Sequence, residues 1–211
     1  GTRAIGNWAG LSGGGFYLER CQKGVLFSAC DISNNTAILR GAGLEVQYTS
    51  NVEFRSNSSV NFNTAELAPA VHFTSIFDAD PGFQTQWVNP FYRWPNLGHA
   101  SLILHDVLVE GNTASGIDGK GAITIFGDSV GRITGSTFRG NNAHFGAALF
   151  TQLQADVECS SSSFVANNAI VGAVFTTDDS RLKLQSVKFT ENNVDYGSLA
   201  LNSTLPHSLM S

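Results

Sequence analysis

The sequence predicts an all-β protein, a right-handed parallel β-helix (β-solenoid) of about seven rungs with one long loop insertion. A short motif recurs along nearly the whole chain of 211 residues. Before each copy, apolar residues alternate with a period of two, as in strands with one buried face. Only 14% of the residues are charged and 22 are glycine, a composition that favours turns and strands over a coiled coil or helical bundle.

The motif is clearest near the C-terminus, where a phenylalanine is followed three residues later by an asparagine. Its three copies begin at Phe138, Phe164 and Phe189, which are 26 and 25 residues apart. Each copy leads to a glycine, a small residue and an apolar stretch, at 146–150, 172–175 and 197–201. A period of this length with two or three short strands indicates a β-solenoid, in which each circuit of the chain forms one rung.

The same frame extends upstream in four more copies. They begin at Val109, Ile32 and Gly6, with a poorer copy at Phe54. Rungs in a parallel solenoid stack about 4.8 Å apart, so equivalent asparagines are expected to hydrogen-bond as a ladder. Asparagine also tolerates the left-handed backbone of a tight corner, and the Gly-Ala pairs mark the next corner. The phenylalanines are expected to stack inside, and the predicted ladder comprises Asn7, Asn35, Asn57, Asn112, Asn141, Asn167 and Asn192.

These residues resemble the repeat of the polymorphic membrane proteins (Pmp), with its short motifs FxxN and GGA[ILV]. The first is matched at 54–57, 138–141, 164–167 and 189–192, and the second is approximated at 13–16, 121–123 and 172–174. The resemblance implies a right-handed parallel β-helix, a surface location and an adhesive or structural role. It brings no catalytic motif with it.

One insertion, at about 76–100, interrupts the repeat. The 55 residues from Phe54 to Val109 span about two periods but hold one motif copy. Residues 70–74 align with 173–176, and Ser101 resumes the next strand. Long loops on rigid scaffolds often carry function. Three interpretations remain open for the insertion: a cap with its own small core, a protein interface, or a glycan-binding surface. The candidate binding residues are Phe77, Phe83, Trp87, Phe91, Tyr92 and Trp94.

No catalytic or metal-binding constellation stands out, and no cofactor is expected. Glycosidases and lyases need clustered acids, but the acids of this chain do not converge in the repeat register. They are Asp178 with Asp179, Asp118 with Asp128, and Asp78 with Asp80 near His99. His72, His105 and His144 are interpreted as ordinary surface or corner residues. The sequence therefore predicts a protein that is not an enzyme.

The three cysteines allow two interpretations. Cys21 and Cys30 are close enough in sequence to pair, but the register places Cys30 and Cys159 inward, which favours buried thiols. Glycosylation sequons occur at Asn34, Asn57 and Asn202. Since Asn57 is assigned to the ladder, where a buried amide cannot be modified, Asn34 and Asn202 are the better candidates.

The composition also bounds the partners. A net charge of −5 argues against nucleic acid, and no apolar run is long enough for a transmembrane segment. Residues 1–211 form a single domain whose two ends look open, as in a segment of a longer solenoid or a subunit that stacks end to end into a filament.

The hypothesis is a non-catalytic structural or adhesive β-helix of an extracellular or cell-surface protein. Its expected partners are itself, flanking rungs, glycans or a surface protein. The alternative is a polysaccharide-binding or polysaccharide-cleaving β-helix that uses the aromatic insertion.

Overall fold

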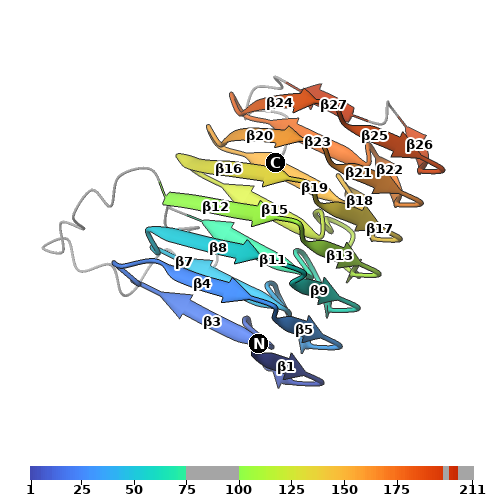
Figure 1. Ribbon diagram of the computed structural model, residues 1–211. Coiled ribbons are helices and arrows are strands. Elements are labelled where there is room, and N and C mark those ends of the chain that lie inside the picture. Colours follow the sequence, from blue (N-terminus) through green and yellow to red (C-terminus); the bar gives the residue numbers. More distant parts are fainter. Residues whose placement is uncertain (75–99, 197–199, 204–211) are drawn as a thin grey trace, which may run out of the picture.

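The computed structural model describes residues 1–74, 100–196 and 200–203, and every regular element within them is a β-strand. The strands form four parallel sheets, numbered here 1 to 4 in the order in which the chain visits them. Each circuit of the chain adds one strand to every sheet, and the circuits stack into a column (Figure 1). The predicted all-β solenoid is confirmed.

Sheet 1 contains seven short strands, β1 (Arg3–Ile5), β5 (Asp31–Ser33), β9 (Ser59–Asn61), β13 (Leu108–Glu110), β17 (Thr137–Arg139), β21 (Ser163–Val165) and β25 (Lys188–Thr190). Sheet 2 follows across a corner with β2 (Trp8–Ala9), β6 (Thr36–Ala37), β10 (Thr64–Ala65), β14 (Thr113–Ala114), β18 (Asn142–Phe145), β22 (Asn168–Val171) and β26 (Asn193–Tyr196).

Sheet 3 contains β3 (Phe16–Glu19), β7 (Leu44–Gln47), β11 (Val71–Thr74), β15 (Ile123–Phe126), β19 (Leu149–Gln152), β23 (Val174–Thr177) and β27 (Ala200–Ser203). Sheet 4 contains six strands, β4 (Val25–Ser28), β8 (Asn51–Arg55), β12 (Ala100–His105), β16 (Ser129–Thr134), β20 (Asp156–Ser160) and β24 (Arg181–Gln185).

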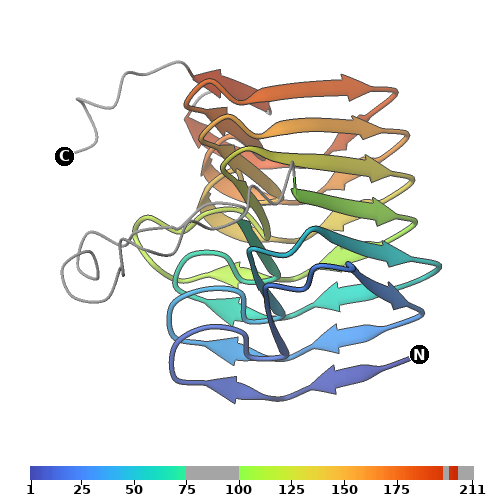
Figure 2. The same ribbon diagram turned by 90° about the vertical axis from the view of Figure 1, so that its left-hand side faces the viewer.

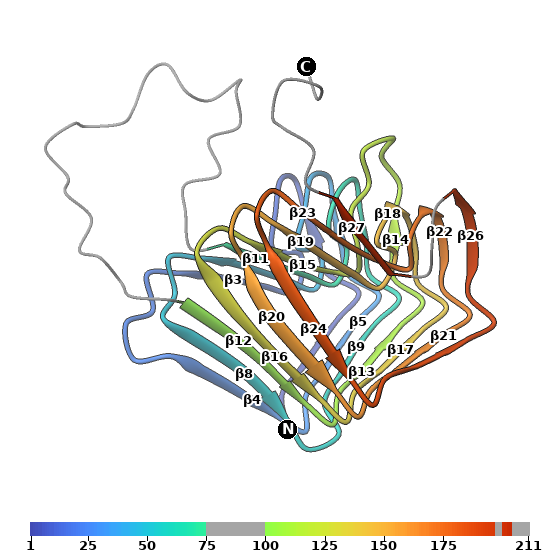
Figure 3. The ribbon, with the colours of Figure 1, turned by 90° about the horizontal axis from the view of Figure 1, so that it is seen from above.

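The chain thus completes six rungs, β1–β4 to β21–β24, and begins a seventh with β25–β27. Figure 2 shows the circuits lying parallel from one end to the other. Seen from the C-terminal end, the chain winds counterclockwise as it approaches the viewer (Figure 3). The solenoid is therefore right-handed, the hand that parallel crossover connections adopt almost without exception.

Columns of apolar side chains fill the interior. The rings of Phe138 and Phe164 stack with their centroids 4.8 Å apart, and Phe189 stacks on Phe164 at 5.0 Å. In sheet 4, Phe27 stacks on Phe54 at 4.7 Å. Stacked aromatic rings bury large apolar areas in favourable geometry, so each rung is stabilised mainly by its two neighbours.

Small residues form the corner that leads into sheet 3. A Cβ on Gly43 would lie 2.5 Å from the carbonyl oxygen of Ala70, and one on Gly121 would lie 2.2 Å from that of Gly146. Because these contacts are with backbone, a larger residue would force neighbouring rungs apart. The Gly-Ala pairs therefore mark a close-packed corner.

The three cysteines are free thiols. Cys30 and Cys159 are buried, as their register predicted, and Cys21 is half-buried. Pairing of Cys21 with Cys30 is absent from this structure.

Candidate functional site

An asparagine ladder runs the length of the solenoid at the corner between sheets 1 and 2. At every step, the Nδ2 of one asparagine donates to the Oδ1 of the next at 2.8–3.0 Å. The backbone N–H of the same residue donates to that oxygen at 3.0–3.1 Å. The members, in order, are Asn7, Asn35, Asn63, Asn112, Asn141, Asn167 and Asn192.

Each ladder asparagine after the first also reaches back to the preceding rung. Its Nδ2 donates to a carbonyl oxygen three residues before the previous ladder position, for example from Asn35 to Ala4 at 2.9 Å and from Asn192 to Phe164 at 2.8 Å. The five interior amides from Asn35 to Asn167 are fully buried. Every one of them finds its partners within the stack, as a buried polar group must.

The structure corrects the assignment of Asn57. The ladder member of the third rung is Asn63, and Asn57 is exposed at the corner between β8 and β9. Two residues of this corner, Ser56 and Asn57, have positive φ, whereas the equivalent corner of the next rung is one residue shorter and has a single residue with positive φ, Asp106. Phe54 lies in sheet 4, where it pairs with Leu104, and the residue of this rung equivalent to the motif phenylalanine is Val60, six residues later.

A signal for Asn63 was present in the sequence. Asn63 begins the triplet Asn-Thr-Ala, which also begins at Asn35 and at Asn112. In addition, the ladder asparagines themselves do not have the left-handed backbone that was predicted for them. The residue immediately before each one does, as at Asn34 (φ 55°) and Glu191 (φ 55°).

The three sequons lie in different settings. Asn34 and Asn57 are exposed corner residues, so the objection that burial blocks modification of Asn57 no longer applies. Asn202 lies in β27, where its backbone is the register partner of Thr176.

The aromatic residues of the insertion, Phe77, Phe83, Trp87, Phe91, Tyr92 and Trp94, lie outside the described residues. The chain leaves sheet 3 after Thr74 and rejoins sheet 4 at Ala100, already the first residue of β12.

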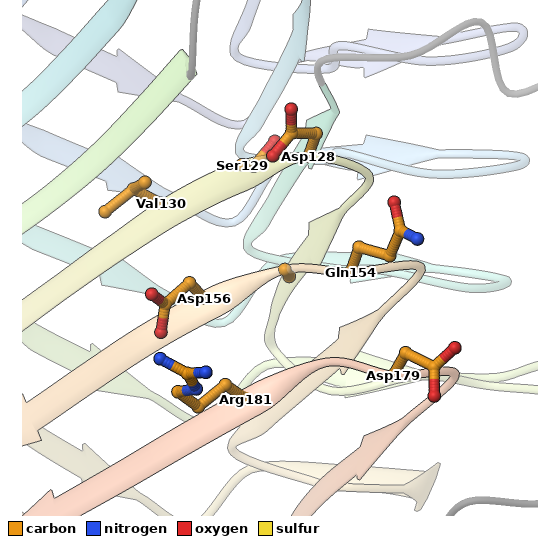
Figure 4. A pocket seen from close by; sticks show the side chains of 8 residues that line it. Asp128, Ser129, Val130, Gln154, Asp156, Asp179 and Arg181 are labelled. Carbon is orange, nitrogen blue, oxygen red and sulfur yellow. The ribbon is translucent and has the colours of Figure 1, made fainter.

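A shallow groove of about 430 Å³ runs along the corner between sheets 3 and 4 (Figure 4). Asp128, Asp156 and Asp179 line it from three successive rungs, with Arg181 on the strand next to Asp156. Asp128 and Asp179 therefore share one surface, which the register had not predicted. Within the described ranges, no group of three or more acid, histidine or cysteine side chains could hold a metal ion.

The groove begins beside the point where the insertion rejoins the solenoid. Ala100 pairs in register with Ser129, one of the residues that line the groove. By contrast, Asp118 is exposed in the loop between β14 and β15, away from this corner.

A buried polar cluster lies just before the insertion, and it corrects the interpretation of His72 as a surface residue. His72 is 3% exposed, and its Nδ1 lies 3.0 Å from Oε1 of the fully buried Glu45. Arg40 Nε lies 3.4 Å from the same oxygen, and Gln47 Nε2 donates to it at 2.9 Å. Buried charges persist where they are paired, so the cluster fixes this part of sheet 3.

The two end rungs differ in their exposed side chains. Five of the large exposed hydrophobic residues among the described ranges belong to the first rung, namely Ile5, Trp8, Leu11, Tyr17 and Leu26. Strands β24 to β26 and the corners between them expose one large hydrophobic residue, Tyr196, and five charged residues, Arg181, Lys183, Lys188, Glu191 and Asp195. Beneath them, Leu182, Leu184, Val187 and Phe189 are only partly buried against the core.

Comparison with protein-family models, with curated proteins and with solved structures finds no match to this chain. What the structure shares with the Pmp-like interpretation is the stack of parallel rungs. The described residues include no helix that is long and apolar enough to cross a membrane.

Proposed function

We propose that this chain is a non-catalytic structural or adhesive β-solenoid of an extracellular or cell-surface protein, and that its end rungs are its contact surfaces. The apolar first rung carries the proposal. Two of its exposed hydrophobic residues, Tyr17 and Leu26, alternate along β3 and β4 with half-buried core residues, Phe16, Leu18 and Val25. An apolar sheet edge with unpaired backbone groups is a template for further strands. The Pmp-like motifs and the sequons support the surface location.

Electron microscopy of the purified chain over a range of concentrations tests this function. We expect negative-stain images to show fibres that lengthen with concentration. Their axial repeat is expected near the height of seven rungs, on the order of 35 Å, or a small multiple of it. Discrete particles at every concentration would contradict self-association.

A second candidate function is the binding or cleavage of a polysaccharide. The acidic groove beside Ala100 favours it, because glycoside chemistry uses carboxylates on one surface and the neighbouring insertion supplies aromatic residues that can stack on sugar rings. Trp87→Ala and Trp94→Ala variants separate the two functions, with Phe62→Ala, an exposed aromatic residue elsewhere, as the control. Loss of sugar binding with intact assembly supports the polysaccharide function, whereas loss of assembly alone supports the structural one.

A further inference from the structure

The first ladder residue has an unused acceptor. The Nδ2 and backbone N–H of Asn7 both donate to Asn35 Oδ1. Among the described residues, nothing donates to the Oδ1 of Asn7, the atom that accepts two hydrogen bonds in every later ladder residue. The N-terminal face of the ladder therefore presents an acceptor.

The last ladder residue has the complementary groups. The Oδ1 of Asn192 accepts from Asn167, and its Nδ2 donates to the carbonyls of Phe164 and Thr190. No acceptor in the described part of the chain meets the backbone N–H of Asn192. The carbonyl of Phe189, three residues before Asn192, is equivalent to the one that Phe164 offers to the next rung.

From this polarity we propose that the C-terminal face of one copy of the chain docks on the N-terminal face of a second copy, in the register of the ladder. The backbone N–H and Nδ2 of Asn192 donate to Oδ1 of Asn7 in the second copy, whose Nδ2 donates back to the carbonyl of Phe189. The contact repeats the three hydrogen bonds of an internal step. This inference rests on the proposed structural function and names its partner and register.

A second column gives the same register independently. At the corner between sheets 4 and 1, backbone N–H groups donate to a serine Oγ of the next rung at 3.2 Å, from Cys30 to Ser58, from Val107 to Ser136 and from Ser136 to Ser162. Thr2 occupies this column in the first rung, because its carbonyl accepts from Asp31 at 3.0 Å. Val187 occupies it in the seventh. Docking in the ladder register therefore brings the N–H of Val187 to the hydroxyl of Thr2 in the next copy.

The same docking covers the open core. Three apolar side chains at the two ends are only partly buried where they pack against the interior. They are Phe16 and Leu18 on the N-terminal face and Phe189 on the C-terminal face. Within residues 1–74, 100–196 and 200–203, sheets 1, 2 and 3 each have seven strands and sheet 4 has six. The proposed contact therefore joins sheets 1, 2 and 3 and leaves the width of one strand between β24 and the next copy's β4.

Mixing two variants tests the polarity of the contact. Asn7→Ala impairs only the N-terminal face and Asn192→Ala only the C-terminal face. By sedimentation velocity, we expect the wild-type chain to form an open-ended series of oligomers. Asn7→Ala removes all three hydrogen bonds of the contact and should need about tenfold more protein or higher to associate, whereas Asn192→Ala removes the one from its Nδ2 and should need about fivefold more. The equimolar mixture should form dimers and stop there, since each dimer has one intact contact and two impaired ends.

Asn142→Ala is the control, since Asn142 is exposed in the middle of the solenoid and lies outside the ladder. It should associate like the wild type, and thermal unfolding checks that all variants remain folded. If the wild type associates and Asn7→Ala associates equally well, the ladder inference is wrong while the structural function stands. If the wild type stays monomeric up to its solubility limit, the self-docking inference and the end-contact part of the proposed function both fail.

Discussion

At the scale of single residues, the ladder depends on the chemistry of the primary amide. Asparagine carries an acceptor and two donors on one short side chain. In this protein Oδ1 faces the preceding rung and takes two hydrogen bonds from it, while Nδ2 bonds to both adjacent rungs. A side chain with only donors or only acceptors would leave a buried partner unsatisfied on one side.

Asn141→Ala should therefore be costly. The change removes the oxygen that accepts from the backbone N–H and Nδ2 of Asn112, and the Nδ2 that donates to the carbonyl of Val109 and to Oδ1 of Asn167. Since each unsatisfied buried group costs about 1–3 kcal/mol, we expect a loss of about 3 kcal/mol or more in the free energy of unfolding, measured by urea denaturation.

Its exposed neighbour supplies the matched control. Asn142→Ala should change the free energy of unfolding by less than about 0.5 kcal/mol, as surface substitutions usually do. Equal losses in the two variants would show that the ladder hydrogen bonds add nothing to stability beyond a surface amide.

A second prediction concerns pH. Burial raises the pKa of the Cys159 thiol from 9.0 to about 11. Between these values the unfolded chain releases the thiol proton and the folded chain keeps it, so the unfolded state is favoured as the pH rises. The stability contribution is intact below about pH 9 and decreases toward pH 11, by about 2–3 kcal/mol in total at about 1.4 kcal/mol per pH unit.

The comparison of wild type with Cys159→Val isolates this group from the other residues that titrate at alkaline pH. The difference in the free energy of unfolding between the two proteins should change steadily from pH 9 to pH 11 in favour of the variant. A difference that stays constant with pH would mean that Cys159 ionises as easily in the folded chain as in the unfolded one.

At the scale of strands and corners, the sequence predicted those features that recur at a fixed offset. Phe138, Phe164 and Phe189 are followed by an asparagine at the same distance, and the structure stacks them. The prediction was wrong where the motif letters occur at a different place in the rung. Residues 54–57 match FxxN, but Phe54 lies in sheet 4 and Asn57 lies at the corner that follows it. The ladder residue Asn63 comes three residues after Val60, the sheet 1 partner of Val109.

The groove was missed although part of its register is regular. Asp128 and Asp179 both lie ten residues before a motif phenylalanine, Phe138 and Phe189, whereas Asp156 lies eight residues before Phe164. The corner between sheets 3 and 4 has the same length in these three rungs, so counting back from the motif places Asp128 and Asp179 at equivalent positions.

Deletions test the account of the corner. Removal of Asn57 restores the one-residue corner found at Asp106, so the variant should fold and lose at most about 1 kcal/mol of stability. Removal of Asp106 leaves no corner residue, and a one-residue slip would turn Val109 outward and Leu108 inward. We expect that variant to be unfolded or aggregated when both are compared by circular dichroism and thermal unfolding. Similar stability of the two deletions would contradict the corner account.

At the scale of the whole molecule, stability passes from rung to rung. Each strand pairs only with the equivalent strands of the adjacent rungs, so interior rungs have two stabilising neighbours and end rungs have one. The half-buried core residues at the two ends, such as Leu18 and Leu184, reflect this difference. Local opening should therefore begin at the ends of the solenoid.

Hydrogen exchange followed by mass spectrometry can test both this gradient and the proposed docking. In dilute protein, amides of β1–β3 and β25–β26 should exchange first, and those of β13–β20 last. At concentrations where the chain associates, the end strands should gain protection while the central strands stay unchanged, because docking converts end rungs into interior ones. Slower exchange confined to the outer face of one sheet would instead indicate side-by-side association, in which the open ladder ends take no part.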